Sequence, residues 1–270
     1  MAFGDYGSIG QARPRKSEST SRPFAINQIV HKSNDRLDQD IALCEKYRVP
    51  IIITSLGART EVNDAVHNWG GIVLHDVISN AFAQKAVSKG ADGIIAVATG
   101  AGGHAGTTSP FALGQEIRSW FNGPLALSGA IADGRSILAA QAMGADFAYV
   151  GSAFIATDEA RADENYKQMI TECDSSDIIY SNSFSGVQGN YLRPSVVRAG
   201  LDPENLTVSD PSKMDFSQKA TGNAKVWKDI WGCGHSISSV RSVVPIADLV
   251  GRLKDEYLTA LVELNQRAIR

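Results

Sequence analysis

The chain has 270 residues, of which 43% are hydrophobic and 20% are charged, and its formal net charge is −3. These values are typical of a globular protein with a large core and argue against a disordered chain or a coiled coil. Because Lys and Arg are scattered along the sequence, we expect no surface for nucleic acid or anionic lipid, and a small molecule is the expected partner.

The cysteines Cys44, Cys173 and Cys233 are far apart and form no CxxC pair. This spacing argues against a disulfide framework and a structural zinc site, and it favours a reducing, cytoplasmic compartment. No apolar run approaches the roughly 20 residues that a membrane-spanning helix needs. Residues 1–22 carry several glycines and a mixed Arg/Lys/Ser stretch without the apolar core of a signal peptide, so we expect a flexible leader there.

From Phe24 onward, short apolar runs alternate with longer amphipathic segments, a pattern typical of repeated β-α units around a parallel sheet. Six strands are predicted, at residues 24–30, 50–54, 71–77, 92–98, 124–128 and 146–151. Helices are predicted between and after them, at residues 35–47, 60–69, 80–89, 110–121, 134–143 and 159–173. Several strands are apolar on both sides, which indicates a sheet covered on both faces.

The alternating pattern stops after about Cys173, where Pro194, Pro203 and Pro211 indicate irregular connections between short helices. A final amphipathic helix is predicted at residues 246–270, packing on the body of the same chain or on a partner subunit. We therefore expect a leader at 1–22, a cofactor-binding β/α region at 23–175, and a cap with a terminal helix at 176–270.

The best candidate for catalysis is His104 in the sequence Ala-Gly-Gly-His-Ala-Gly, which directly follows the strand at residues 92–98. Parallel β/α barrels place their active sites at this end of their strands. Gly102 and Gly103 would allow close approach to a flat or phosphorylated ligand, and a histidine can exchange a proton near neutral pH. The alternative is a turn with an incidental histidine.

Two further loops follow the next two strands. They contain Ser128 with Gly129, and Gly151 with Ser152. Backbone N–H groups of such loops commonly bind phosphate near the last strands of a barrel. The alternative is that small residues merely make tight β-α turns.

Other polar residues leave more than one interpretation open. Asn27 lies in an apolar strand, where its amide meets either a ligand or a neighbouring backbone group. His75 and Asp76 close a strand and could line the site or form a structural hydrogen bond. His235, in Gly-Cys-Gly-His, could reach the site.

The sequence has no Walker loop, no Gly-x-Ser-x-Gly elbow and no His-Glu-x-x-His helix, so nothing supports a nucleotide triphosphatase, a serine hydrolase or a zinc protease.

The residues 90–96, Gly-Ala-Asp-Gly-Ile-Ile-Ala, with the Gly-Gly-His, Leu-Ser-Gly and Gly-Ser loops, resemble the nitronate monooxygenases, formerly called 2-nitropropane dioxygenases. The resemblance runs from about Arg22 to Tyr257. It implies a TIM-type (β/α) barrel that binds FMN and oxidises alkyl nitronates with O2, without metal. Family members begin with two further β-α units, so six of eight are expected here. The open barrel would be closed by another subunit, giving a homo-oligomer, or partly filled by the leader.

The resemblance also implies roles for the loop residues. His104 would be the catalytic base or electrostatic partner beside the flavin, with Gly102 and Gly103 next to it. The phosphate would be held by four residues, namely Ser128, Gly129, Gly151 and Ser152. Asn27 would lie near the isoalloxazine.

Two departures from the family pattern accompany the shorter start. Ala130 stands where a second glycine is usual and could narrow the room for phosphate, and Gly-Cys-Gly-His-Ser at 232–236 replaces a Gly-Gln-Gly segment. Two alternatives remain open: a truncated homologue that is inactive or binds flavin weakly, and another FMN barrel oxidoreductase such as an enoyl-thioester reductase.

Overall fold

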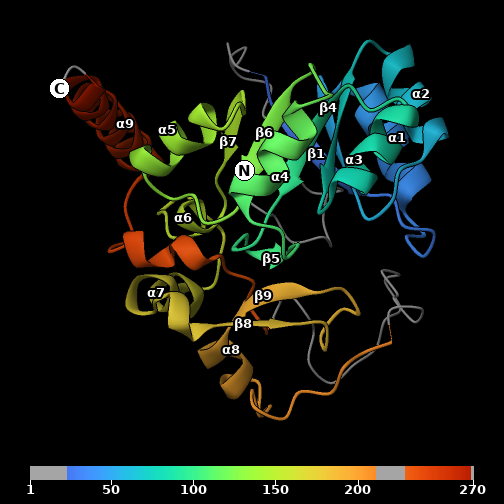
Figure 1. Cartoon of the computed structure of the whole chain (residues 1–270). Helices are drawn as coiled ribbons and strands as arrows, with labels where there is room; N and C mark the ends of the chain where they lie inside the picture. Colours follow the sequence, from blue (N-terminus) through green and yellow to red (C-terminus); the bar gives the residue numbers. More distant parts are fainter. Residues whose placement is uncertain (1–22, 211–228, 269–270) are drawn as a thin grey trace.

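The computed structural model describes residues 23–210 and 229–268. Its main feature is a six-stranded parallel sheet whose neighbours follow in chain order, β1-β2-β3-β4-β6-β7 (Figure 1). The strands are β1 (Ala25–Ile29), β2 (Ile51–Ser55), β3 (Ile72–Val77), β4 (Gly93–Val97), β6 (Leu125–Ser128) and β7 (Phe147–Tyr149). All six predicted strands are therefore present, with ends that differ by at most two residues. The prediction of an α/β fold with a parallel sheet is confirmed.

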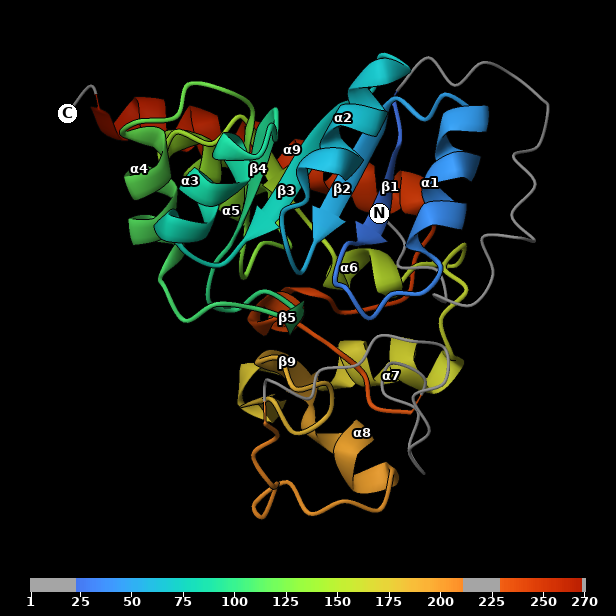
Figure 2. The same ribbon diagram turned by 90° about the vertical axis from the view of Figure 1, so that its right-hand side faces the viewer.

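Five helices follow five of these strands and pack on one face of the sheet. They are α1 (Leu37–Lys46), α2 (Thr60–Asn68), α3 (Asn80–Ser88), α4 (Pro110–Arg118) and α5 (Gly134–Ala142). In Figure 2, α1 to α4 lie in front of the strands. The core between the layers contains buried side chains such as Ile52, Val73, Ile94, Leu125 and Leu127.

On each strand, every second side chain points to the opposite face of the sheet. Ile53, Ile95 and Ala126 form a small buried cluster there, packed against Leu74 and Val97 among others. In the described residues, helices pack on one face of the sheet, and on the other face Ile53 and Ile95 are each 1% exposed, so the side chains of both faces are shielded from solvent as expected. A curved sheet of a barrel type packs its inner face in this way.

The predicted helix at residues 159–173 is present in a shorter form as α7 (Glu164–Glu172), and a further short helix that was not predicted, α6 (Ser152–Ile155), lies directly after β7. The start of α7 is fixed by Asp163, whose side chain accepts a hydrogen bond from the backbone N–H of Asn165 at 2.9 Å. A carboxylate in this position caps a helix and stabilises its first turn.

The region after Cys173 was expected to contain only irregular connections and short helices, and this is wrong in one respect. A second, antiparallel sheet is present, in the order β5-β9-β8, formed by β5 (Gly103–His104), β9 (Gly189–Leu192) and β8 (Ile178–Ser181). Strand β5 belongs to the loop after β4, so this sheet lies at the carboxyl ends of the parallel strands (Figures 1 and 2). Helix α8 (Arg193–Arg198) and the short 3-10 helices η1 (Ser175–Asp177) and η3 (His235–Ser239) complete this part.

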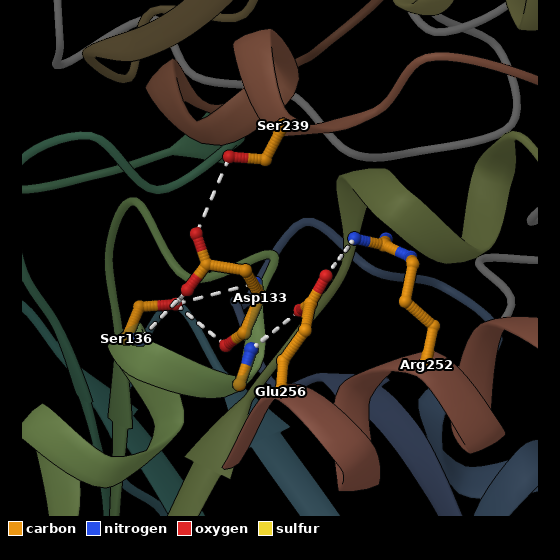
Figure 3. Close-up of polar contacts among 6 residues, drawn as sticks. Asp133, Ser136, Ser239, Arg252 and Glu256 are labelled. Atoms are coloured by element: carbon orange, nitrogen blue, oxygen red, sulfur yellow. Dashed lines mark hydrogen bonds and ion pairs between the residues drawn. The ribbon is translucent and has the colours of Figure 1, made fainter. Parts of the chain in front are cut away.

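Helix α9 (Ile246–Ala268) lies against α5 (Figure 1). Figure 3 shows how the two are joined: the Glu256 carboxylate accepts a hydrogen bond from the backbone N–H of Gly134 at 2.9 Å and pairs with Arg252 at 2.9 Å. Asp133 caps the N-terminus of α5, where its carboxylate accepts a hydrogen bond from the backbone N–H of Ser136. The same carboxylate also accepts a hydrogen bond from the Ser239 hydroxyl at 3.3 Å. A carboxylate at a helix N-terminus is stabilised by the partial positive charge there.

The division into segments at residues 22 and 175 stays a prediction, and the predicted leader at 1–22 lies outside the described residues. Among the helices of the described ranges, none combines the length and apolar character needed to cross a membrane.

Candidate functional site

The loop that follows β4 carries His104 to the interface between the two sheets. Its backbone folds back on the strand, because Gly106 N–H donates to the Val97 carbonyl at 3.3 Å and Thr99 N–H donates to Thr108 at 2.8 Å. His104 is paired with Gly189 of β9. The loop is therefore held by both sheets and is not a free turn.

The imidazole of His104 is largely shielded from solvent. Its Nε2 lies 2.8 Å from the Ser185 hydroxyl. Burial lowers the pKa of His104 from 6.5 to about 4, because desolvation disfavours the charged form. The ring is therefore neutral at neutral pH and can accept a proton or a hydrogen bond. Ser185 was missed by the sequence analysis, since it lies 81 residues away in an unremarkable Ser-rich stretch.

Glycine is needed at positions 102 and 103 because of the backbone conformation and the close packing of the loop. Gly103 has φ +70, and a Cβ on Gly102 would lie 2.7 Å from the backbone nitrogen of Gly234. His235 N–H donates to the Gly100 carbonyl at 3.0 Å, while the His235 side chain is exposed. The segment 232–235 thus packs backbone to backbone against the Gly-Gly-His loop.

An aromatic stack holds this segment in place. The ring of Tyr166 stacks on Trp231 with centroids 4.8 Å apart, and the Arg198 guanidinium lies 3.6 Å from the Trp231 ring. The Tyr166 hydroxyl donates to the carbonyl of Gly232. These residues were not identified as functional from the sequence, because their contacts join α7, α8 and a distant loop.

The loop after β6 contains the first predicted phosphate residues. The Ser128 side chain is buried at the end of β6. Gly129 has φ +139, and a Cβ there would lie 2.7 Å from the Thr99 carbonyl oxygen. Ala130 has φ +54, a left-handed conformation that favours glycine, and its N–H donates to Gly100 at 3.2 Å.

Gly151 and Ser152 differ in their surroundings. A Cβ on Gly151 would meet no atom within 4 Å, so open space faces this position at the start of α6. The Ser152 hydroxyl, in contrast, accepts a hydrogen bond from the Gly234 N–H at 2.9 Å. Gly151 can therefore face a ligand, whereas the Ser152 hydroxyl fixes the segment next to the Gly-Gly-His loop.

Asn27 lies on the inner face of the sheet in a row with two other polar side chains. The Ser55 hydroxyl lies 2.9 Å from Asn27 Oδ1 and 2.6 Å from Asp76 Oδ2. Desolvation raises the pKa of Asp76 from 3.8 to about 6, and the hydrogen bond from Ser55 opposes this. Ser55 was not singled out from the sequence, although it follows the same alternation as Asn27 and Asp76.

His75 points the other way. It lies on the helix-covered face of β3, where its Nδ1 is 2.5 Å from the Thr54 hydroxyl. Burial lowers the pKa of His75 to about 4. The sequence left open whether His75 and Asp76 line the site or form a structural hydrogen bond. His75 forms a structural hydrogen bond, whereas Asp76 lies on the inner face beside Asn27.

The described residues fit a flavin with a phosphate tail at the carboxyl ends of the strands. The open space at Gly151 and the buried side chain of Ser128 lie where the neighbouring strands β7 and β6 end, a place where barrels commonly bind phosphate. A hollow of about 440 Å³ between α5, β7 and α9 is lined by none of the predicted site residues. Within the described ranges, no three His, Cys, Asp or Glu side chains are grouped as metal ligands.

Comparison with known proteins gives consistent results. A family model described as nitronate monooxygenase matches residues 12–256. A nitronate monooxygenase of Paraburkholderia phytofirmans is 28% identical over 201 residues, which cover 69% of this chain and 54% of that protein. The putative monooxygenase Rv1533 of Mycobacterium tuberculosis is 32% identical over 239 residues, covering 80% of this chain and 63% of that protein.

A solved structure of nitroalkane oxidase from Streptomyces ansochromogenes is similar with a TM-score of 0.78 and 22% identity, and the match covers 91% of this chain and 83% of that one. This likeness and the sequential order of the parallel strands confirm the predicted TIM-type (β/α) barrel fold. The chain spans between about half and two thirds of the length of the two curated relatives. By the extent of the family match, this chain belongs to the nitronate monooxygenase family.

Proposed function

We propose that this chain binds FMN and oxidises alkyl nitronates with O2. The observation that carries the proposal is the buried, neutral His104 in a loop fixed at the carboxyl ends of the strands, together with the open space at Gly151. Membership of the nitronate monooxygenase family supports it, and the structural likeness to a nitroalkane oxidase agrees with it.

In this proposal the residues of the site have different roles. Ser128, Gly129, Gly151 and the backbone of Ser152 hold the phosphate, and Asn27 faces the isoalloxazine. Gly102 and Gly103 keep the loop backbone close to the ring. When bound, FMN would supply the redox chemistry between the substrate and O2.

His104 orients the substrate by a hydrogen bond and accepts a proton from the carbon next to the nitro group when a neutral nitroalkane binds. Because a pKa of about 4 makes the imidazole a weak base, we expect preformed nitronate to be oxidised faster than the parent nitroalkane. Both substrates are small molecules, and no further partner is needed apart from a second copy of the chain if the protein is a homo-oligomer.

The test is to purify the full chain, measure its flavin content by absorbance, and record oxygen uptake with the nitronate and the neutral form of nitroethane. His104→Gln is the matched variant, expected to keep the flavin and lose most of the oxygen uptake. Protein that neither contains flavin nor binds added FMN would overturn the proposal and favour the inactive homologue. Rapid bleaching of the flavin by a reduced nicotinamide, without nitronate-dependent oxygen uptake, would favour a reductase.

A further inference from the structure

Three neighbouring strands place one polar side chain each in a row on the inner face of the sheet. Asn27 of β1, Ser55 of β2 and Asp76 of β3 are linked through the Ser55 hydroxyl, which lies 2.9 Å from Asn27 Oδ1 and 2.6 Å from Asp76 Oδ2. The rest of this face is mainly apolar, with Ile53 and Ile95 as close neighbours. Three polar groups in such surroundings must satisfy one another.

The number of hydrogen atoms limits how they can do so. A hydroxyl carries one hydrogen, so Ser55 cannot donate to both Asn27 Oδ1 and Asp76 Oδ2. With the carboxyl protonated, Asp76 donates to Ser55 and Ser55 donates to Asn27 Oδ1. With the carboxyl ionised, Ser55 donates to Asp76, and the Asn27 amide must turn over so that its Nδ2 donates to Ser55.

The observed arrangement has Asn27 Oδ1 next to Ser55, which matches the protonated form. In that form Nδ2 is directed away from Ser55. The amide hydrogens are therefore available on the inner side of the sheet. In the ionised form the carbonyl oxygen would be presented there instead.

The surroundings of Asp76 allow this titration near neutral pH. On the flanking strands the residues of the same face are Ile53, Ser55, Ile95 and Val97, and none of them is ionisable. His75 lies on the opposite face of β3. Desolvation is the main cause that raises the pKa of Asp76 to about 6, and no charge from His104 or from another described residue contributes.

We propose that Asp76 is a positioning residue whose protonation, relayed by Ser55, sets which end of the Asn27 amide faces the inside of the barrel. One proton taken up by the Asp76 carboxyl makes Asn27 a hydrogen-bond donor, and its loss makes Asn27 an acceptor. The proposal rests on the proposed function only for the statement that a flavin ring lies opposite Asn27. The ring then meets a donor at low pH and an acceptor at high pH.

The first experiment needs no flavin. Nuclear magnetic resonance of the full chain follows the Asp76 carboxyl carbon and the Asn27 side-chain amide as the pH is raised from 4.5 to 8. We expect both signals to change together, with a midpoint near pH 6. Ser55→Ala should keep a titration of Asp76, with the midpoint moved to higher pH because the hydrogen bond from Ser55 is lost, and it should abolish the response of Asn27 because the relay is removed. Asp64→Asn, at an exposed position of α2, is the control and should leave both unchanged.

The second experiment measures the affinity for riboflavin across the same pH range, because riboflavin lacks the phosphate of FMN, which itself titrates near pH 6. We expect wild type to change with a midpoint near pH 6, and Asp76→Asn and Ser55→Ala to lose this change. Asp76→Asn keeps the size of the side chain and donates to Ser55, so it should fold and resemble wild type at low pH.

The proposal would be overturned, whether or not FMN binds, if the Asp76 carboxyl titrates below about pH 4.5. It would also be overturned if the signal of the Asn27 amide does not change as Asp76 titrates. An unchanged pH dependence of riboflavin affinity in Asp76→Asn would do the same. Absence of FMN binding with a normal linked titration would count against the proposed function alone.

Discussion

The substitution Gly151→Ala separates phosphate binding from folding. A Cβ at this position meets no protein atom within 4 Å, and the φ of −116° is ordinary for alanine, so the free energy of unfolding should stay the same or rise by about 0.4–1 kcal/mol. If the phosphate of FMN occupies this space, the methyl group displaces a charge-assisted hydrogen bond worth about 1.5–3 kcal/mol. FMN affinity should then fall by about ten- to a hundredfold.

The assay is a fluorescence titration with FMN and with riboflavin, which lacks the phosphate. Wild type should prefer FMN, and Gly151→Ala should lose that preference while binding riboflavin as before. Gly251→Ala is the matched control, because it also adds a methyl in open space but lies on the distant helix α9. An unchanged preference for FMN in Gly151→Ala would refute the placement of the phosphate, and a large loss of stability would refute the description of the open space.

Three further substitutions test the packing around the site and the terminal helix. Ala130→Gly relieves a φ of +54 and should raise the free energy of unfolding by about 0.5–1 kcal/mol in urea, and a decrease would contradict the strain. Gly102→Ala places a Cβ 2.7 Å from the backbone nitrogen of Gly234 and should cost on the order of 1–3 kcal/mol; wild-type stability would show that the two backbones do not touch. Glu256→Gln weakens the bond to the Gly134 N–H and should cost about 0.5–1 kcal/mol in thermal unfolding at low salt, an effect that 1 M salt should reduce.

The parallel sheet could be predicted from the sequence because each of its strands is a local pattern. A run such as 51–54 is short, apolar and β-branched, and glycine or a capping residue marks its end, so neither the strand nor the following helix depends on distant residues. The second sheet could not be predicted in this way. Strand β5 is only two residues long, and its partner β9 lies more than 80 residues later, so the pairing leaves no periodicity in the sequence.

The same distinction applies to the candidate site. Gly102, Ser128 and Gly151 were identified because each follows a strand, which is a local signal. The partners of these loops come from the cap: Ser185 meets His104, and Gly234 meets Ser152, and only the folded chain brings them together. The Ala130 departure has a local explanation too, because the usual glycine would suit a positive φ that alanine adopts here under strain.

Because the pKa of His104 is lowered by burial, the free energy of unfolding should depend on pH in a way that an exposed histidine would not produce. Its folded value is about 4, against 6.5 for an exposed histidine, so below pH 6.5 the unfolded chain binds a proton that the folded chain does not. Stability therefore falls as the pH drops from 6.5 to 4, by about 3 kcal/mol at most from this residue alone.

His104→Gln removes the titrating group, so its unfolding free energy in urea should be less sensitive to pH across this window than that of wild type. Between pH 6.5 and 8 the two proteins should respond to pH in the same way. His67→Gln, at a half-exposed position on α2, is the control for the loss of a histidine. The same base should give oxygen uptake an acidic limb near pH 4 in kcat/KM. Two results would show that the imidazole is exposed to solvent and would refute its desolvation. One is an acidic limb of kcat/KM near pH 6.5. The other is a free energy of unfolding of wild type that does not fall relative to that of His104→Gln on acidification.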